Sequence, residues 1–204
     1  MRYERKYIHI MINVYDNIKN LLNFDNEDDF YYLQIIQRKK ENPQLGSNSR
    51  IIKNYYISSL DYLENRYDEI TELCVNFNAR AMLRLNKRSY RKVAFKSMQN
   101  IANSMANGEY SFIKKSYDRA CGKGHNDKDK TWIIDLDGII NDDYLIKVKK
   151  SINESNPEGD KIVCQLPTKN GIHLITKPFD LRDFREKYKD VDIHKDNPIN
   201  LFIP

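Results

Sequence analysis

The chain has 204 residues, of which 40% are hydrophobic and 31% charged, and its formal net charge is +5. This length suits one large domain or two small ones that share an interface, and the composition allows a buried core. We expect neither a membrane span, which needs about 18 apolar residues in a row, nor a secretory signal. Three widely spaced cysteines without a CxxC pair make a disulfide framework or zinc site unexpected, so we expect a cytoplasmic protein. The richness in Asn, Lys, Ile and Tyr is typical of coding by an AT-rich genome, such as that of a virus. If a phage encodes the chain, the expected location is the cytoplasm of its host.

The first part of the chain alternates between helical and strand patterns. Apolar residues from Ile8 to Leu22 recur at helical spacing. Two aromatic and β-branched segments, 30–37 and 51–58, read as strands joined by a basic loop, 38–50, as in a long-tipped hairpin. We expect the "QRKKENP" part of that loop to be only an exposed loop.

Two capped helices and a strand follow. Ser58 or Ser59 can cap a helix whose packed face carries Leu60, Leu63, Tyr67, Ile70 and Cys74. Segment 79–86 alternates apolar and polar residues, which is typical of a half-buried strand. Ser89 can cap a second helix with Ala94, Met98, Ile101 and Met105 on one face, and the polar segment 116–130 then reads as a linker. We therefore divide the chain into an N-terminal α/β module, 1–120, and a second half, 128–204.

The second half has the order βαββαβ. Its strands are expected at 130–138, 161–167, 171–178 and 199–204, with helices around Tyr144–Ile152 and after Asp180. The short "TKN" connection between the second and third strands implies antiparallel pairing. This order is that of the split βαβ, or RRM-like, unit. The expected fold class is α+β, with an RRM-like half packed against an α/β module.

The stretch "TWIIDLDGIIN" places Asp135 and Asp137 at the end of a strand. Because strand side chains alternate, both carboxylates point to one face, which we expect to be the face away from the helices. Two adjacent carboxylates raise each other's pKa, and a divalent cation such as Mg²⁺ or Mn²⁺ relieves the repulsion. The alternative is a polar turn, since Asp and Gly commonly follow an apolar strand.

The same stretch also resembles the first motif of haloacid-dehalogenase-like phosphatases, in which the first aspartate is the nucleophile. That family usually has Thr or Val two places after the second aspartate, whereas this chain has Ile139 there, followed by Ile140. That family also needs a parallel sheet, whereas the "TKN" connection predicts an antiparallel neighbour. We therefore favour a metal-holding pair over a phosphatase nucleophile.

A second constellation surrounds His173 in "LPTKNGIHLITKPF". Gly171 clears space for a ligand or another backbone, and Lys169 and Thr168 lie in the preceding turn. A single strand histidine is commonly structural. In a βαββαβ sheet, however, the first and third strands are neighbours, so His173 is expected on the same face as Asp135 and Asp137.

Together these motifs resemble the archaeo-eukaryotic primase superfamily, which includes phage and plasmid primase–polymerases. "WIIDLDG" matches its DxD motif, "TKNGIHLI" its Gly-x-His motif, and "DVDIHKDNP" offers Asp192, with Asp196 as a substitute, for its third acidic position. The resemblance implies a template-dependent nucleotidyltransferase of replication, in which Asp135, Asp137 and Asp192 hold two Mg²⁺ or Mn²⁺ ions. It implies that His173, with Lys169 and Thr168 as weaker candidates, contacts the phosphates of a nucleoside triphosphate. It further implies a DNA template as partner and leaves room for a helicase.

A basic segment could hold the template. "RLNKRSYRKVAFK" concentrates positive charges around an aromatic ring, a composition suited to phosphates and a stacked base; these candidates are Arg84, Lys87, Arg88, Tyr90, Arg91 and Lys92. The alternative is a solvated helix face. A second functional hypothesis remains open beside the enzyme: a catalytically inactive, primase-like or RRM-like protein that binds nucleic acid or acts as an adaptor.

Overall fold

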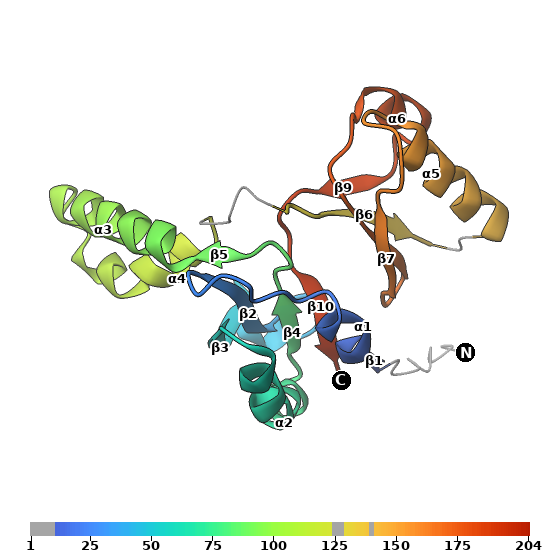
Figure 1. The fold of residues 1–204 in the computed structure, drawn as a ribbon. Helices are drawn as coiled ribbons and strands as arrows, with labels where there is room; N and C mark the ends of the chain where they lie inside the picture. The colour runs from blue at the N-terminus through green and yellow to red at the C-terminus, as the bar shows by residue number, and fades with distance from the viewer. Residues whose placement is uncertain (1–10, 124–128, 139–140) are drawn as a thin grey trace, which may run out of the picture.

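The computed structural model describes residues 11–123, 129–138 and 141–204. These residues form a mixed α+β structure with two antiparallel sheets, and an arm of helices projects from one side of it (Figure 1). Within the described residues, none of the helices combines the length and the apolar character that crossing a membrane requires.

The first sheet has the strand order β1-β10-β4-β2-β3, and β5 pairs with β2. Each of these pairings is antiparallel. The strand bounds are β1 Ile12–Asn13, β2 Asp29–Gln37, β3 Arg50–Ile57, β4 Arg80–Leu83, β5 Arg88–Ser89 and β10 Ile199–Ile203. The predicted hairpin is confirmed as β2 and β3, and the predicted alternating strand as β4.

The last strand was predicted to complete the βαββαβ unit, and this was wrong. β10 instead returns to the first sheet and pairs with β4 and β1. Its side chains explain the choice, because Ile199, Leu201 and Ile203 are all buried in the core of the first sheet. The C-terminal strand therefore ties the second half of the chain to the first module (Figure 1).

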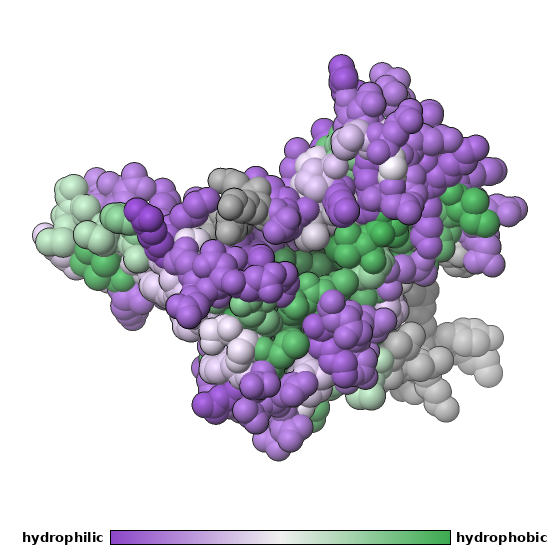
Figure 2. Space-filling view, viewed as in Figure 1, coloured by the Kyte–Doolittle hydropathy of each residue, from purple (hydrophilic) through white to green (hydrophobic). Residues whose placement is uncertain are grey.

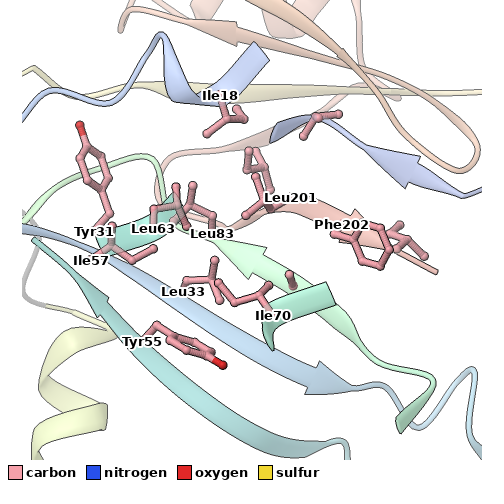
Figure 3. Packing of buried hydrophobic residues seen from close by; sticks show 14 of the residues in the cluster. Ile18, Tyr31, Leu33, Tyr55, Ile57, Leu63, Ile70, Leu83, Leu201 and Phe202 are labelled. Carbon is pink, nitrogen blue, oxygen red and sulfur yellow. The ribbon is translucent and has the colours of Figure 1, made fainter. Parts of the chain in front are cut away.

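Helix α2, Leu60–Phe77, packs on the first sheet, and its Leu63 and Ile70 lie among the buried residues of the core (Figure 3). The Oγ of Ser59 accepts a hydrogen bond from the Tyr62 amide at 3.0 Å, which confirms the predicted cap. The predicted packed face is also correct at Leu63, Ile70 and Cys74, which are buried.

Helix α1, Tyr15–Lys19, is shorter than the predicted first helix. Ile12 lies in β1, opposite Ile203 of β10, so the chain is extended where the helical spacing predicted a helix. Ile8, the first residue of that pattern, lies outside the described residues. Ile12 is extended because it pairs with a strand that is remote in the sequence, and local periodicity does not reveal such a partner.

Helix α3, Tyr90–Ala106, begins at the predicted cap, with the Oγ of Ser89 accepting from the Lys92 amide at 3.1 Å. Its predicted packed face was wrong, because Val93, Ser97 and Ser104 are buried and Met98 and Met105 are exposed. The short turns η1, Pro43–Leu45, and η2, Tyr110–Lys115, and helix α4, Ser116–Cys121, complete the first module. The prediction of a linker at 116–130 was wrong over α4, because this helix packs on α3 and buries Ala120 and Cys121. Residues 124–128 of the predicted linker lie outside the described residues.

The second sheet has the order β7-β8-β6-β9, and all its pairings are antiparallel. Its elements follow the predicted order, with β9 as the last strand: β6 Trp132–Asp137, α5 Asp142–Glu154, β7 Ile162–Pro167, β8 Gly171–Thr176, α6 Arg182–Lys187 and β9 Asp192–His194. The short connection 168–170 joins β7 to β8 in an antiparallel pair, as predicted. Helices α5 and α6 cover one face, where Ile134 and Leu136 are buried.

The opposite face of the second sheet packs toward the first module. Ile133, Leu166 and Ile175 belong to the same buried cluster as the first sheet. A polar contact joins the modules as well, because the side-chain amide of Asn86 bonds the backbone of Thr131 and of Lys195. The face that carries the predicted carboxylates is therefore partly covered by the first module, whereas the sequence suggested an open face.

Candidate functional site

Three candidate residues form a row across the second sheet. Asp135 of β6 lies opposite His173 of β8 on one side and opposite Asp192 of β9 on the other. Residues directly opposite each other in a sheet project from the same face. The structure therefore brings together the predicted first aspartate, the histidine and the third acidic residue, although they lie far apart in the sequence.

Alternation along β6 explains why this row faces away from the helices. Ile134 and Leu136 point into the core beneath α5 and α6, so Asp135 and its neighbours Ile133 and Asp137 must point to the other side. Asp137 lies opposite Gly171 at the end of β8 and is exposed. The two carboxylates thus share a face, with Asp135 deeper and Asp137 nearer the strand end.

Two histidines surround the carboxylate of Asp135. The Nε2 of His173 lies 3.3 Å from its Oδ1, and the Nε2 of His194 lies 3.8 Å from its Oδ2. The nearby imidazole of His173 holds the pKa of Asp135 below its ordinary value, and His194 adds to this, against the opposing effect of burial. The sequence led us to expect a raised pKa for Asp135; its net shift is instead downward, because the effect of the two histidines exceeds that of burial.

The carboxylate of Asp135 retains an unused acceptor. Its Oδ1 is buried, and no hydrogen bond of good geometry reaches it from the described residues; the contact with His173 is close but poorly directed. An unsatisfied buried carboxylate oxygen is costly, so such an atom calls for an explanation. A cation or a protonated histidine above it would each satisfy it.

A small acidic pocket adjoins the row at the end of β6. Its volume is about 170 Å³, and four of the seven described residues that line it are aspartates, Asp135, Asp137, Asp190 and Asp192. The others are Leu136, Val191 and Tyr144 of α5. Asp190 was not among the predicted residues, although its place two positions before Asp192 could have indicated it.

A larger cleft, of about 800 Å³, opens beside the same carboxylates. The second module contributes Asp135, Asp137, His173 and the turn residues Thr168, Lys169 and Asn170 to its lining. Arg38 and Lys40 of the first module also line it. Parts of the loop "QRKKENP" are exposed, as predicted, and the loop also forms part of the lining of the cleft that holds the predicted site residues. Its run of three basic residues was the signal for this second property.

The glycine of the Gly-x-His motif has a structural role. A Cβ on Gly171 would lie 2.0 Å from the carbonyl oxygen of Leu136, which no side chain could tolerate. Of the two alternatives for this glycine, the approach of another backbone is the one observed. Gly171 thus allows β8 to pair closely with β6 and so positions His173 beside Asp135.

Asp196, the alternative third acidic residue, serves a different purpose. Its carboxylate accepts from the Nη2 of Arg88 at 2.9 and 3.0 Å, and Arg84 lies 3.5 Å away. Asp192, by contrast, is exposed and lies directly opposite Asp135. Geometry therefore favours Asp192 as the third acidic residue of the site.

The predicted template patch is divided by the structure. Arg88 is completely buried, Arg84 pairs with Asp196, and the Nζ of Lys87 lies 3.4 Å from the buried Asp29 carboxylate. Tyr90 stacks on Phe30 with ring centroids 4.4 Å apart. These four residues support the fold, and Arg88 in particular has no surface with which to contact a phosphate.

The other two members of the patch, Arg91 and Lys92, are exposed at the start of α3.

The three carboxylates Asp135, Asp137 and Asp192 are chemically suited to a divalent cation, but their present arrangement fits one only in part. Carboxylate oxygens are the ligands that Mg²⁺ and Mn²⁺ prefer, and the unsatisfied Oδ1 of Asp135 lies among them. As the side chains stand, no three acidic, histidine or cysteine groups of the described residues converge as a metal site would require. Asp137 and Asp192 are exposed, so rotation of their side chains could bring them toward Asp135.

Comparisons of the chain with models of known protein families, with curated protein sequences and with solved structures find no match.

Proposed function

We propose that the protein is a template-dependent nucleotidyltransferase of the primase–polymerase type, with an RRM-like second half. The observation that carries this proposal is the row Asp192–Asp135–His173, formed by three strands at the edge of a cleft that both modules line. The strand order β7-β8-β6-β9 supports it, because that order makes β6 and β8 neighbours, as the resemblance requires. The antiparallel pairing of β6 disfavours the phosphatase alternative, which needs a parallel sheet.

The carboxylates Asp135, Asp137 and Asp192 would hold Mg²⁺ or Mn²⁺. Bound there, two such ions would activate a 3′-hydroxyl and stabilise the pyrophosphate leaving group. The chain's own contribution is the placement of Asp135: its carboxylate is held on the shared face of β6 beside two histidines, which lower its pKa. An ionised carboxylate is the form in which aspartate binds these cations.

The cleft offers positive groups for a triphosphate. His173 and Lys169 lie on its second-module side, and Arg38 and Lys40 on its first-module side. We propose that the nucleoside triphosphate is bound between these two sides, with His173 nearest the carboxylates. The negative charge of the triphosphate would then be balanced by positively charged side chains from both modules.

We propose that a DNA template contacts the exposed start of α3 through Arg91 and Lys92. Exposed Lys and Arg side chains bind phosphates without regard to sequence, and their binding weakens with salt. Arg84, Lys87, Arg88 and Tyr90 are left out of this contact because of their structural partners.

The second candidate function is an inactive primase-like protein that binds nucleic acid or acts as an adaptor. The observation in its favour is that the acidic side chains of the described residues do not converge on a single point. This candidate predicts nucleic-acid binding without nucleotide incorporation.

A primer-extension assay separates the two candidates. Purified protein is incubated with a primed DNA template, labelled ribo- or deoxynucleoside triphosphates, and Mn²⁺ or Mg²⁺. We expect incorporation by the wild type and a loss of at least about 100-fold in Asp135→Ala, in line with the removal of a group that stabilises the transition state. The matched control is Asp160→Ala, an exposed aspartate of the same module, which should retain wild-type activity.

Two outcomes would contradict the enzyme proposal. Wild-type protein that binds the template but incorporates no nucleotide under any of these conditions would favour the adaptor. Equal incorporation by wild type and Asp135→Ala would show that the row is not the catalytic site.

A further inference from the structure

Helix α3 presents three distinct faces. One packs against the rest of the arm and is largely polar; Val93, Ser97 and Ser104 are buried there and Asn100 is half-buried. A second is polar, with Lys92, Gln99 and Asn103 exposed and Lys96 half-buried. The third is apolar and mostly exposed, and we call it the α3 stripe; it consists of the exposed Ala94, Phe95, Met98, Ala102 and Met105 and the half-buried Ile101.

The α3 stripe is unusual because the apolar side of this amphipathic helix lies outside. Phe95, Met98 and Met105 are 64, 66 and 55% exposed. The helix lies on an arm that projects away from both sheets (Figure 1), and green, apolar atoms are visible on that arm in Figure 2. A helix in a monomer normally turns such a stripe toward a core, so the stripe indicates a surface that another molecule covers.

The spacing of the stripe is that of a helix–helix seam. Ala94 and Ile101, Phe95 and Ala102, and Met98 and Met105 are each seven residues apart. A seven-residue apolar repeat is the pattern by which one helix packs along another. The expected occupant is therefore a helix, rather than the planar base of a nucleotide or the side of a sheet.

We propose that the occupant is the α3 stripe of a second copy of this chain, packed antiparallel about a two-fold axis at Met98. This proposal does not depend on the proposed function. A two-fold pairing of one stripe with itself needs no other surface, and most homo-oligomers are of this isologous kind.

The distribution of charge along α3 supports self-pairing in this orientation. The charged residue that flanks the stripe is Arg91, at the start of the helix, and Glu109 follows the helix end. In an antiparallel pair, Arg91 of each copy lies beside Met105 of the other, in the last turn of that helix and close to its last carbonyl groups; Glu109 follows three residues after the helix end. A cation beside a helix C-terminus is favourable, and the stem of the arginine can cover the methionine. A parallel pair would instead set the two Arg91 side chains against each other.

The size of the seam predicts a weak dimer. A helix of 17 residues is about 25 Å long, so the stripe alone covers less than a standard protein interface. Interfaces below that size belong to transient complexes. The association should therefore depend on protein concentration.

Sedimentation equilibrium tests the proposal on the full chain. Between about 5 and 500 µM, the wild type should shift from monomer toward dimer. Met98→Glu should abolish the shift, because the two-fold axis would then set one glutamate against another. The matched control is Val75→Glu, which places the same charge on an exposed apolar residue of α2 and should leave the dimer unchanged. Circular dichroism at low concentration, where each protein is a monomer, verifies that both variants fold.

Disulfide trapping tests the orientation. In an antiparallel pair, residue 94 of one copy lies opposite residue 102 of the other. A mixture of Ala94→Cys and Ala102→Cys proteins should form a mixed disulfide dimer faster than either protein alone, whereas a parallel pair would favour the two homodimers.

Three results would overturn the proposal. One is a wild type that stays monomeric throughout the concentration range, and another is a dimer that persists in Met98→Glu. The third is a monomeric wild type that binds anionic vesicles or single-stranded DNA in a Met98-dependent way, which would assign the stripe to a membrane or a nucleic acid.

Discussion

Removing the carboxylate of Asp196 should destabilise the protein strongly, because it leaves the buried guanidinium of Arg88 without a counter-ion. Arg88 is fully buried, and its Nη2 lies 2.9 and 3.0 Å from the two carboxylate oxygens. Its Nε and Nη1 donate to the carbonyl oxygens of Cys121 at 2.6 Å and Asn86 at 2.7 Å; these acceptors are neutral, so Asp196 is the group that balances the positive charge. Breaking one partner of a buried pair costs about 3–5 kcal/mol.

For a chain of this length, each kcal/mol lowers the melting temperature by about 2–4 °C, so Asp196→Ala should melt roughly 6–20 °C below the wild type. Thermal unfolding followed by circular dichroism and by the fluorescence of Trp132, the one tryptophan of the chain, measures the change. Glu154→Ala is the control, since it removes an acid from an exposed pair with Lys150 and should leave stability close to that of the wild type. A loss in Asp196→Ala no larger than in the control would refute the stabilising role of this buried pair.

Two further changes test the site. Gly171→Ala should destabilise the second sheet, because the added methyl group would collide with the carbonyl oxygen of Leu136. Gly122→Ala is the control and should be tolerated, because the nearest atom to its Cβ lies 3.4 Å away. Equal melting temperatures of the two variants would contradict this prediction. In the folded protein, the pKa of Asp135 lies below its ordinary value of 3.8. Ionised Asp135 therefore stabilises the fold at any pH above 3.8, and this contribution is lost as the pH falls through the lower pKa of the folded state. Urea unfolding from pH 6 to pH 2 should therefore show wild-type stability falling more steeply than that of Asp135→Asn in the acid range, and parallel curves would show that the histidines do not stabilise the carboxylate.

The central part of the candidate site was predictable from the sequence because its determinants are local. Alternation along β6 placed Asp135 and Asp137 on the face away from the helices, and a three-residue connection required β7 and β8 to pair antiparallel. The order βαββαβ then placed β6 next to β8, and so Asp135 next to His173.

Contacts between distant segments could not be predicted in this way. The apolar residues of β10 would suit either sheet, and only the three-dimensional packing assigns them to the first. Arg88 reads as a surface cation until its partner Asp196, more than a hundred residues later, is seen beside it. The loop of Arg38 and Lys40 reaches the cleft through the folding of β2 and β3, which no local pattern indicates.

Helix α3 shows a different limit. Its apolar face was identified correctly, but the assumption that an apolar face packs within the same chain failed, because Ser97 and Ser104 are turned inward instead. Periodicity reveals which residues share a face, and not what covers it.

The measurement that tests the central claim most directly is the binding of Mn²⁺ in the presence of a nucleoside triphosphate, followed by electron paramagnetic resonance. If Asp135, Asp192 and His173 form one metal–nucleotide site, the wild type should bind Mn²⁺, and Asp135→Asn and Asp192→Asn should each weaken binding by about tenfold or more, as loss of a metal ligand or its partner does. Asp160→Asn, on the same module, should bind as the wild type does. Binding of Mn²⁺ with equal affinity by all four proteins, or by none of them, would contradict the claim.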